Sequence, residues 1–266
     1  KVPAHLLTRF TIVSSTMRVI FFILGVILAE SAMASPIPKD CRQLVVAISE
    51  DRNASNGQLW MVQRASPDQA WKLAAGPIPT RLGRTGMVWG RGLHTPPRAA
   101  PLKKEGDGKT PCGAFAIGKA YGTLAPNTVQ RRPKLSYVHI GPSDLWVEDV
   151  QSQHYNRHIR LPDGRGPQND WEKKQQMRLN DNAHKLKLFI AHNAHPRIVR
   201  GGGSAIFFHI WRDNGGRPTA GCTAMPEQHL RRLIAWVDPS TKPVFVILPR
   251  SEYKKLRSVW GLPTFR

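Results

Sequence analysis

Short apolar runs, separated by clusters of turn-forming residues, set the pattern along most of the chain. Runs of four to eight apolar, β-branched or aromatic residues that end at Gly, Pro, Asn or Asp are typical of strands rather than helices. The strongest runs late in the chain are residues 186–191 (LKLFIA) and 205–211 (AIFFHIW). Further short strands are predicted at residues 115–117, 137–140, 145–150 and 244–248.

Three more strands are predicted before residue 80. Residues 43–48 (QLVVAI) are rich in β-branched side chains, and residues 58–64 alternate between polar and apolar. The segment between them, 53–57, contains the turn formers Asn, Ser and Gly, so the two strands are predicted to pair antiparallel. Residues 71–75 are the candidate third strand of this small sheet.

Helical periodicity is confined to a few segments. Residues 227–237 place apolar side chains at i, i+3, i+4 and i+7, which gives one apolar face, and Pro226 precedes the segment where a helix tolerates proline. A final helix is predicted at 250–259, and the long polar segment 169–185 is a third candidate. The pattern as a whole therefore predicts a mainly β fold with a few peripheral α-helices.

An uncharged apolar run of 11 residues, 19–29, follows Arg18 near the beginning of the chain. Such a run is too short to span a bilayer and is typical of the core of a signal peptide. Small residues at Ala32 and Ala34 predict cleavage after Ala34, so residues 1–34 are interpreted as upstream sequence and leader. The alternative is a short buried helix. The leader predicts export to the periplasm or cell envelope, with no stable transmembrane anchor after cleavage.

The chain is strongly basic, with 39 Lys and Arg against 18 Asp and Glu, a formal net charge of +21. A positive charge of this size predicts attraction to polyanions such as nucleic acid, anionic membrane or anionic cell wall. Because an exported protein rarely meets nucleic acid, the cell wall is the favoured partner. A solvated basic surface that only maintains solubility is the alternative.

Three cysteines occur, Cys41, Cys112 and Cys222. In an oxidising compartment an odd number leaves at least one thiol unpaired, and the favoured arrangement is a Cys41–Cys112 disulfide with Cys222 free. No Cys-x-x-Cys pair occurs and the histidines are scattered, so the spacing does not favour a metal site.

The segment 201–225 (GGGSAIFFHIWRDNGGRPTAGCTAM) combines a histidine on an apolar strand with a cysteine after a short loop. A free thiol is only slightly ionised at neutral pH, and a neighbouring imidazole is the usual group that removes its proton. His209 is therefore the candidate general base and Cys222 the candidate nucleophile. The backbone amides of Gly221 and Cys222 are candidates to bind a developing oxyanion. The alternative is a structural Cys222 and a core His209.

This segment resembles the active-site region of the L,D-transpeptidase family, the YkuD-type catalytic domain. His209, Thr219, Gly221 and Cys222 match the family's pattern of a histidine on a strand, a loop, and Ser/Thr-x-Gly-Cys. Residues 103–115, which contain EGDGKTP followed by Gly and Phe, resemble a second family stretch. Positions found in one branch of the family are matched by Asp149, Tyr155, Asn156, His192 and Asn193.

The resemblance covers roughly residues 80–250 and implies a β-sandwich or barrel-type catalytic domain over 80–266, with the strands of 35–79 packed on it. It implies two-step acyl transfer on the tetrapeptide stems of peptidoglycan through a Cys222 thioester. It also implies that the backbone carbonyl of Ile210 orients His209, that no cofactor is needed, and that carbapenems acylate the sulfur.

Two positions depart from the family pattern. The histidine usually found before Gly-Cys is Ala220, and the arginine usually found two residues after the cysteine is Ala224. An arginine there is suited to bind a peptide carboxylate, so the chain must bind that carboxylate elsewhere or not at all. Arg212 and Arg217 in the preceding loop are candidates, or they are solvated loop charges.

Other residues are weighed between substrate binding and a structural role. Thr219 either contacts substrate or closes a turn, and Trp211 either lines a groove or belongs to the core. His192, with its neighbour Asn193, is either a second active-site imidazole or a histidine bonded to nearby backbone. Glu105 and Asp107, in a glycine-rich turn, are expected to bond local backbone amides rather than to form a catalytic pair.

Three functions are consistent with the sequence. The favoured one is an L,D-transpeptidase that forms cross-links. The second is a hydrolase on the same fold, an L,D-carboxypeptidase or an endopeptidase acting on peptidoglycan stems. The third is a non-catalytic basic module that binds the cell wall and in which Cys222 is structural.

Overall fold

The computed structural model describes residues 34–129 and 134–265, and Met33–Arg266 form one unit. The predicted leader lies outside the described residues except for Ala34. Within the described ranges, no helix is long and apolar enough to cross a membrane.

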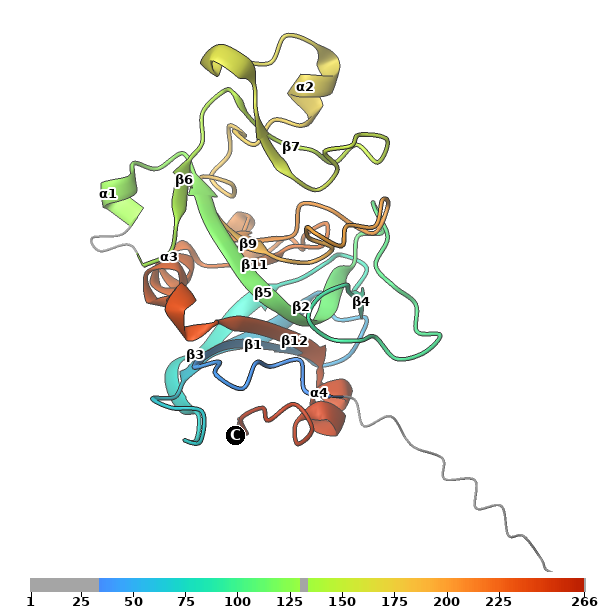
Figure 1. Cartoon of the computed structure of the whole chain (residues 1–266), viewed down its shortest axis with the longest axis vertical. Helices are drawn as coiled ribbons and strands as arrows, with labels where there is room; N and C mark the ends of the chain where they lie inside the picture. Colours follow the sequence, from blue (N-terminus) through green and yellow to red (C-terminus); the bar gives the residue numbers. More distant parts are fainter. Residues whose placement is uncertain (1–33, 130–133, 266) are drawn as a thin grey trace, which may run out of the picture. The chain divides into compact units, whose positions relative to one another are not determined.

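Strands dominate the described residues (Figure 1). The strands are β1 (Gln43–Ser49), β2 (Asn56–Gln63), β3 (Lys72–Arg81), β4 (Met87–Trp89), β5 (Thr110–Gly122), β6 (Tyr137–His139), β7 (Asp144–Trp146), β8 (His158–Arg160), β9 (Leu186–Ile190), β10 (Phe207–Ile210), β11 (Thr223–Met225) and β12 (Val244–Pro249). The α-helices are α1 (Pro126–Val129), α2 (Asp170–Lys174), α3 (Glu227–Trp236) and α4 (Arg250–Leu256). Single 3-10 turns are η1 (Pro162–Gly164), η2 (Asp213–Gly215) and η3 (Pro239–Thr241).

The main sheet closes on itself. Its strand order is β12-β1-β2-β3-β11-β10-β9-β5-β4, and β12 also pairs with β5, so the path from β12 round to β5 forms a ring. A closed sheet leaves few unpaired strand edges and encloses one apolar core. The predicted mainly β, sandwich or barrel-type fold with few helices is therefore confirmed.

The three strands before residue 80 belong to this same sheet. β1 and β2 pair antiparallel as predicted, and β3 continues the sheet on the other side of β2. β1 also pairs in parallel with the C-terminal strand β12, which joins the two ends of the described chain. The ring encloses the large core cluster, on which the apolar face of α3 packs through Leu230, Leu233 and Ile234.

A second, smaller layer lies beside the ring, at the top of Figure 1. It contains the β7–β8 hairpin and α2, and it packs on β5, β9 and β10 through a separate apolar cluster. The described members of that cluster are Tyr121, Ile140, Trp146, Met177 and Phe207, with Cys222 packed against them. The boundary between this layer and the ring is where the candidate site lies.

Several element predictions need correction. The helix predicted over 169–185 is limited to α2, which Asn169 caps by accepting the amide of Glu172. The rest is irregular because its few large apolar residues do not form a stripe, and Trp171 and Leu179 are exposed. The strand predicted at 205–211 begins only at Phe207, since Ala205 has a positive φ of 53°.

The predicted Cys41–Cys112 disulfide is absent, and both thiols are free and buried. Cys41 lies just before the start of β1. Strand β12 lies between β1 and β5, and its pairing with both places Cys112 beside the other end of β1, near Ile48. Seven residues of extended chain span roughly 20 Å, far beyond the Cα separation that a disulfide allows. Burial raises the pKa of both thiols, to about 11 for Cys41 and about 12 for Cys112.

Candidate active site

Strand register brings the candidate nucleophile and base to one face of the sheet. β10 and β11 run parallel, with Phe208 opposite Thr223 and His209 opposite Ala224. Cys222 directly precedes β11, which places it opposite Phe207. Because side chains alternate along a strand, Cys222, Phe207 and His209 all point to the same side.

The turn before Cys222 is fixed by Thr219. Its hydroxyl accepts the Gly221 amide at 3.0 Å and donates to the Cys222 carbonyl at 2.7 Å. Gly221 has φ of 148°, and a Cβ on it would lie 2.9 Å from the Lys109 carbonyl oxygen, so only glycine fits. Thr219 thus closes a turn, the structural alternative of the sequence prediction. The Gly221 amide is already used within that turn, which leaves the Cys222 amide of the predicted pair.

His209 is held in one tautomer. Its Nδ1 lies 2.8 Å from the Ile210 carbonyl oxygen, and since a carbonyl only accepts, Nδ1 carries the proton. Nε2 therefore presents a lone pair, the form a general base requires. The side chain is 5% exposed, and burial lowers the pKa of His209 to about 3, with further lowering from neighbouring His184. His209 is thus neutral at physiological pH.

Cys222 is partly exposed and uncharged in the resting structure. Its Sγ accepts the Phe207 amide at 3.4 Å and donates to the Ala205 carbonyl at 3.4 Å. Burial of the sulfur raises the pKa of Cys222 to about 11, and the carboxylate of Glu148 acts in the same direction. Thiol and imidazole are therefore a neutral pair, rather than a preformed thiolate with an imidazolium.

Both side chains line one cavity of about 310 Å³. Its walls come from the ring on one side and from the smaller layer on the other, which contributes Trp146, Glu148, Gln175 and Met177. Charged groups of both signs face it; these are Arg84, Lys103, Glu105, Glu148 and Lys187. A cavity of this size and mixed polarity suits a charged peptide segment rather than a purely apolar ligand.

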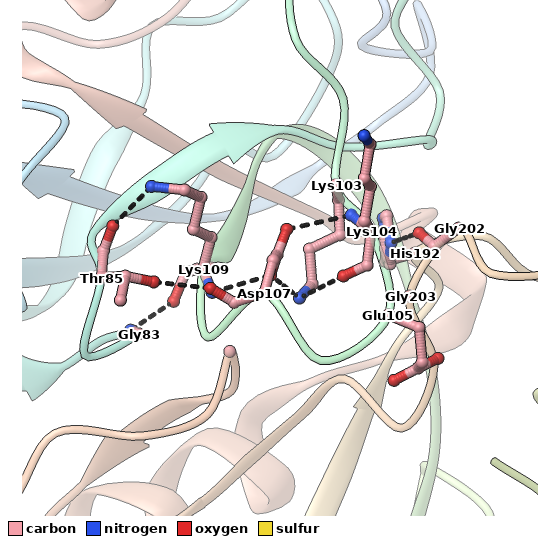
Figure 2. A network of polar contacts seen from close by, with 12 residues as sticks. Gly83, Thr85, Lys103, Lys104, Glu105, Asp107, Lys109, His192, Gly202 and Gly203 are labelled. Carbon is pink, nitrogen blue, oxygen red and sulfur yellow. Dashed lines mark hydrogen bonds and ion pairs between the residues drawn. The ribbon is translucent and has the colours of Figure 1, made fainter.

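The glycine-rich loop 103–110 contributes Lys103, Glu105 and Gly106 to the cavity lining. Figure 2 shows the polar contacts that hold this loop. The Asp107 carboxylate accepts the amides of Lys104 and Lys109, both at 2.9 Å, and forms an ion pair with buried Lys103. Burial would raise the pKa of Asp107, but these three donors outweigh it and lower the pKa. Asp107 thus bonds local backbone amides, as expected from the sequence. Glu105 instead accepts a hydrogen bond from the Tyr155 hydroxyl.

A second group of contacts, made by His184, Asp181 and Arg212, supports the candidate base His209. The His184 ring stacks on His209, with centroids 5.1 Å apart and planes 29° apart. His184 Nδ1 lies 2.8 Å from the Asp181 carboxylate, which also accepts from Arg212 at 2.9 Å. Burial would raise the pKa of Asp181, but the hydrogen bonds from Arg212 and His184 lower it to about 2. Arg212 is therefore committed to Asp181 and does not line the cavity, contrary to its prediction as a substrate-binding residue.

Several other predicted binding residues lie elsewhere. Trp211 packs over Gly215 and lines a different cavity, and Arg217 is an exposed loop residue 3.6 Å from Asp213. The structural alternative holds for His192, which is fully buried, accepts the Arg91 amide at Nδ1 and has Nε2 3.0 Å from the Gly202 carbonyl oxygen.

Asn193 is also structural. It is buried, and its side-chain NH₂ group donates to the carbonyls of Val199 and Gly203. Its side-chain oxygen accepts the Val199 amide. These bonds close the loop that leads into β10. Neither Asn193 nor His192 lines the Cys222 cavity.

The sequence analysis assigned no role to four charged residues of the cavity, Arg84, Lys103, Glu148 and Lys187. Lys187 carried a usable signal, since a lysine inside the apolar run LKLFI breaks the pattern at a position that a strand buries. Arg84, Lys103 and Glu148 carried none, because they come from loops whose placement depends on the tertiary fold. Among the described residues, no cluster of His, Cys, Asp or Glu could hold a metal ion.

Comparison with known proteins agrees with the geometry. A model of the YkuD L,D-transpeptidase catalytic domain matches residues 52–246, which is most of the chain. Searches among curated proteins and among solved structures gave no match. The matched range contains the strand of His209, the Cys222 turn and the loop 103–110 that braces it. The chain therefore belongs to the L,D-transpeptidase (YkuD) catalytic domain family.

Proposed function

We propose that the chain is an exported peptidoglycan L,D-transpeptidase that forms cross-links by acyl transfer through Cys222. The observation that supports this most is the shared cavity of Cys222 and His209, with the imidazole held by Ile210 in the tautomer that accepts a proton. A nucleophile and an oriented base at one cavity are the minimum requirement for covalent acyl transfer.

The first step forms a thioester. Sγ of Cys222 attacks the carbonyl carbon of the third residue of a tetrapeptide stem while Nε2 of His209 removes the thiol proton. The C–N bond to the terminal D-amino acid then breaks, and His209 returns the proton to the leaving amine. The Cys222 amide is the proposed donor to the oxyanion that forms between these events.

The second step releases the sulfur. A side-chain amine of another stem attacks the thioester carbonyl and loses a proton to His209, which returns it to the Cys222 sulfur. The product is an amide cross-link between two stems. Water in place of the amine gives a tripeptide, the product of a carboxypeptidase.

Because the pair is neutral at rest, the proton leaves the sulfur during the attack rather than before it. A thiol pKa near 11 and an imidazole pKa near 3 make a separated ion pair costly at these buried positions. Substrate binding therefore has to supply part of the stabilisation of the charges that develop in the transition state.

Product analysis tests this function. The purified chain, without its leader, is incubated with disaccharide-tetrapeptide, and the products are identified by mass spectrometry. A cross-linked dimer that lacks one terminal residue is the expected product, and Cys222→Ser abolishes it while Cys41→Ser retains it. Tripeptide alone would instead assign hydrolysis, and wall binding without turnover would assign the non-catalytic module.

Carbapenem labelling is an independent readout of the same sulfur. We expect intact-protein mass spectrometry to show one covalent adduct on the unchanged chain and none on Cys222→Ser.

For export, we propose cleavage after Ala34, so that the N-terminal sequence of the protein recovered from the periplasm begins at Ser35.

A further inference from the structure

Lys187 is a buried cation beside the nucleophile and base. It lies in β9, flanked by the fully buried Leu186 and Leu188, and is only 5% exposed. β9 and β10 pair antiparallel with Lys187 directly opposite His209, which places the two side chains on the same face of the sheet. The strand order thus puts Cys222, His209 and Lys187 on three neighbouring strands, in that sequence across the cavity.

This ammonium has no carboxylate partner. Among the ion pairs formed by described residues, none includes Lys187, and its Nζ donates one hydrogen bond, to the Met177 carbonyl at 2.9 Å. It also lies 5.7 Å from the centre of the Phe207 ring. An ammonium has three N–H donors, and burying it without a counter-charge is costly. The arrangement is that of a site completed by an anionic ligand.

The charged groups around Lys187 do not supply that anion. Asp181 is already held by Arg212 and His184. Glu148 lines the same cavity from the smaller layer but makes no ion pair with Lys187. Burial lowers the pKa of Lys187 to about 8, while the carboxylates of Asp181 and Glu148 act to raise it, so the amine is still mainly charged at neutral pH.

The order of the three strands matches the order of atoms in the reaction. The scissile carbonyl carbon must lie at Cys222, and the leaving nitrogen must lie at His209, which protonates it. In a terminal amino acid the carboxylate is one carbon beyond that nitrogen. Continuing from Cys222 past His209, the next strand carries Lys187, one strand spacing of about 4.8 Å further on.

We propose that Lys187 is the specificity-determining residue that binds the free C-terminal carboxylate of the leaving D-amino acid. The inference rests on the proposed function, because it uses the direction of the acyl transfer. Ala224 in β11 stands where the family pattern has an arginine, and a buried alanine cannot bind a carboxylate. In this chain Lys187 in β9 takes that role. Stems whose terminal carboxylate is amidated or extended by another residue are then poor donors.

The test compares two donors, a stem tetrapeptide with a free terminal carboxylate and the same peptide with a terminal carboxamide. Acylation of Cys222 is measured as kcat/KM for the unchanged chain, Lys187→Met and Lys187→Gln. Lys185→Met is the matched control, since Lys185 lies just before the same strand and pairs with Glu227 outside the cavity. The Gln variant keeps a donor for the Met177 carbonyl, which separates carboxylate binding from a role in holding that loop.

We expect the unchanged chain and Lys185→Met to prefer the free acid by about 10- to 100-fold, the range for losing a hydrogen bond to a charged group. In both Lys187 variants the preference falls to within about 3-fold, through loss on the free acid alone. Equal loss on both donors, or an unchanged preference, overturns the inference. If the unchanged chain uses both donors equally, the inference is wrong while the proposed function stands. If neither donor acylates Cys222, the proposed function itself fails.

Discussion

At the scale of single residues, the site combines a thiol and an imidazole that are both uncharged at rest. Burial raises the pKa of Cys222 and lowers that of His209, so the two shifts oppose ionisation of either group. The hydrogen bond to the Ile210 carbonyl fixes the proton on Nδ1 and leaves Nε2 as the acceptor. Reactivity is therefore expected to depend on substrate being bound, which protects the thiol from other electrophiles.

Alkylation measures this neutral state. We expect the rate of Cys222 modification by iodoacetamide to rise continuously with pH and to reach no plateau below about pH 10, because the thiolate fraction grows towards a pKa of about 11. Peptide mapping separates Cys222 from Cys41 and Cys112, which are fully buried and serve as unreactive internal controls. A plateau at neutral pH would show a preformed thiolate and contradict the neutral pair.

At the scale of elements, the strands position the chemistry and two loops hold it. The register of β9, β10 and β11 places Lys187, His209 and Cys222 on one face. Thr219 closes the turn before the sulfur, and the backbone of that turn bridges to Gly83, whose amide donates to Thr110. The loop 103–110 is in turn held by Asp107. The position of the Cys222 sulfur thus depends on hydrogen bonds between segments far apart in sequence.

Removing the Thr219 hydroxyl tests the turn. We expect Thr219→Val to lower the free energy of unfolding by about 1–3 kcal/mol, since two buried hydrogen bonds are lost at nearly constant volume. It should also slow acylation of Cys222, while Thr219→Ser keeps the hydroxyl and restores both properties. Chemical denaturation and the acylation rate measure the two effects. Wild-type values for Thr219→Val would show that the hydroxyl does not hold the turn.

The sequence predicted the elements that have strong local patterns. The runs at β1, β2, β9, β10 and β12 and the apolar stripe of α3 all form as expected, because burial of one face decides them. The three-residue strands β4, β8 and β11 were missed, since pieces this short carry no periodicity and exist through pairing with neighbours.

The same distinction applies to the site. Cys222 and His209, which line one cavity, were singled out because they lie in one short segment of recognisable spacing. His184 and Glu148 were not, because only the tertiary fold brings them to the cavity. For Arg212 the sequence left substrate binding and a solvated loop charge both open, because its partner Asp181, 31 residues away, is invisible in the local sequence.

At the scale of the whole molecule, buried neutral histidines make the fold sensitive to acid. Burial lowers the pKa of both His192 and His209 to about 3, against about 6.5 in an unfolded chain. Between those two values the unfolded chain binds more protons, so stability decreases as the pH falls through that window. The candidate active site and the fold around it are therefore expected to lose stability together in acid.

This sensitivity is measurable between pH 7 and pH 5. At pH 5 each of these two histidines is expected to cost about 2 kcal/mol of unfolding free energy. His192→Gln, which keeps a donor and an acceptor at the same place, should remove the share of that loss due to His192, about 2 kcal/mol. Urea denaturation at the two pH values gives the comparison. Equal stability of the unchanged chain at pH 7 and pH 5 would contradict the buried neutral state.

Trapping the acyl-enzyme tests the central claim most directly. The chain is mixed with a stem tetrapeptide, quenched in acid within milliseconds to seconds, and mapped by peptide mass spectrometry. The account predicts a tripeptidyl thioester on Cys222 that forms about 10²- to 10⁴-fold more slowly in His209→Gln, the range for loss of a general base. A thioester that forms equally fast without His209, or stem turnover by Cys222→Ser, would contradict it.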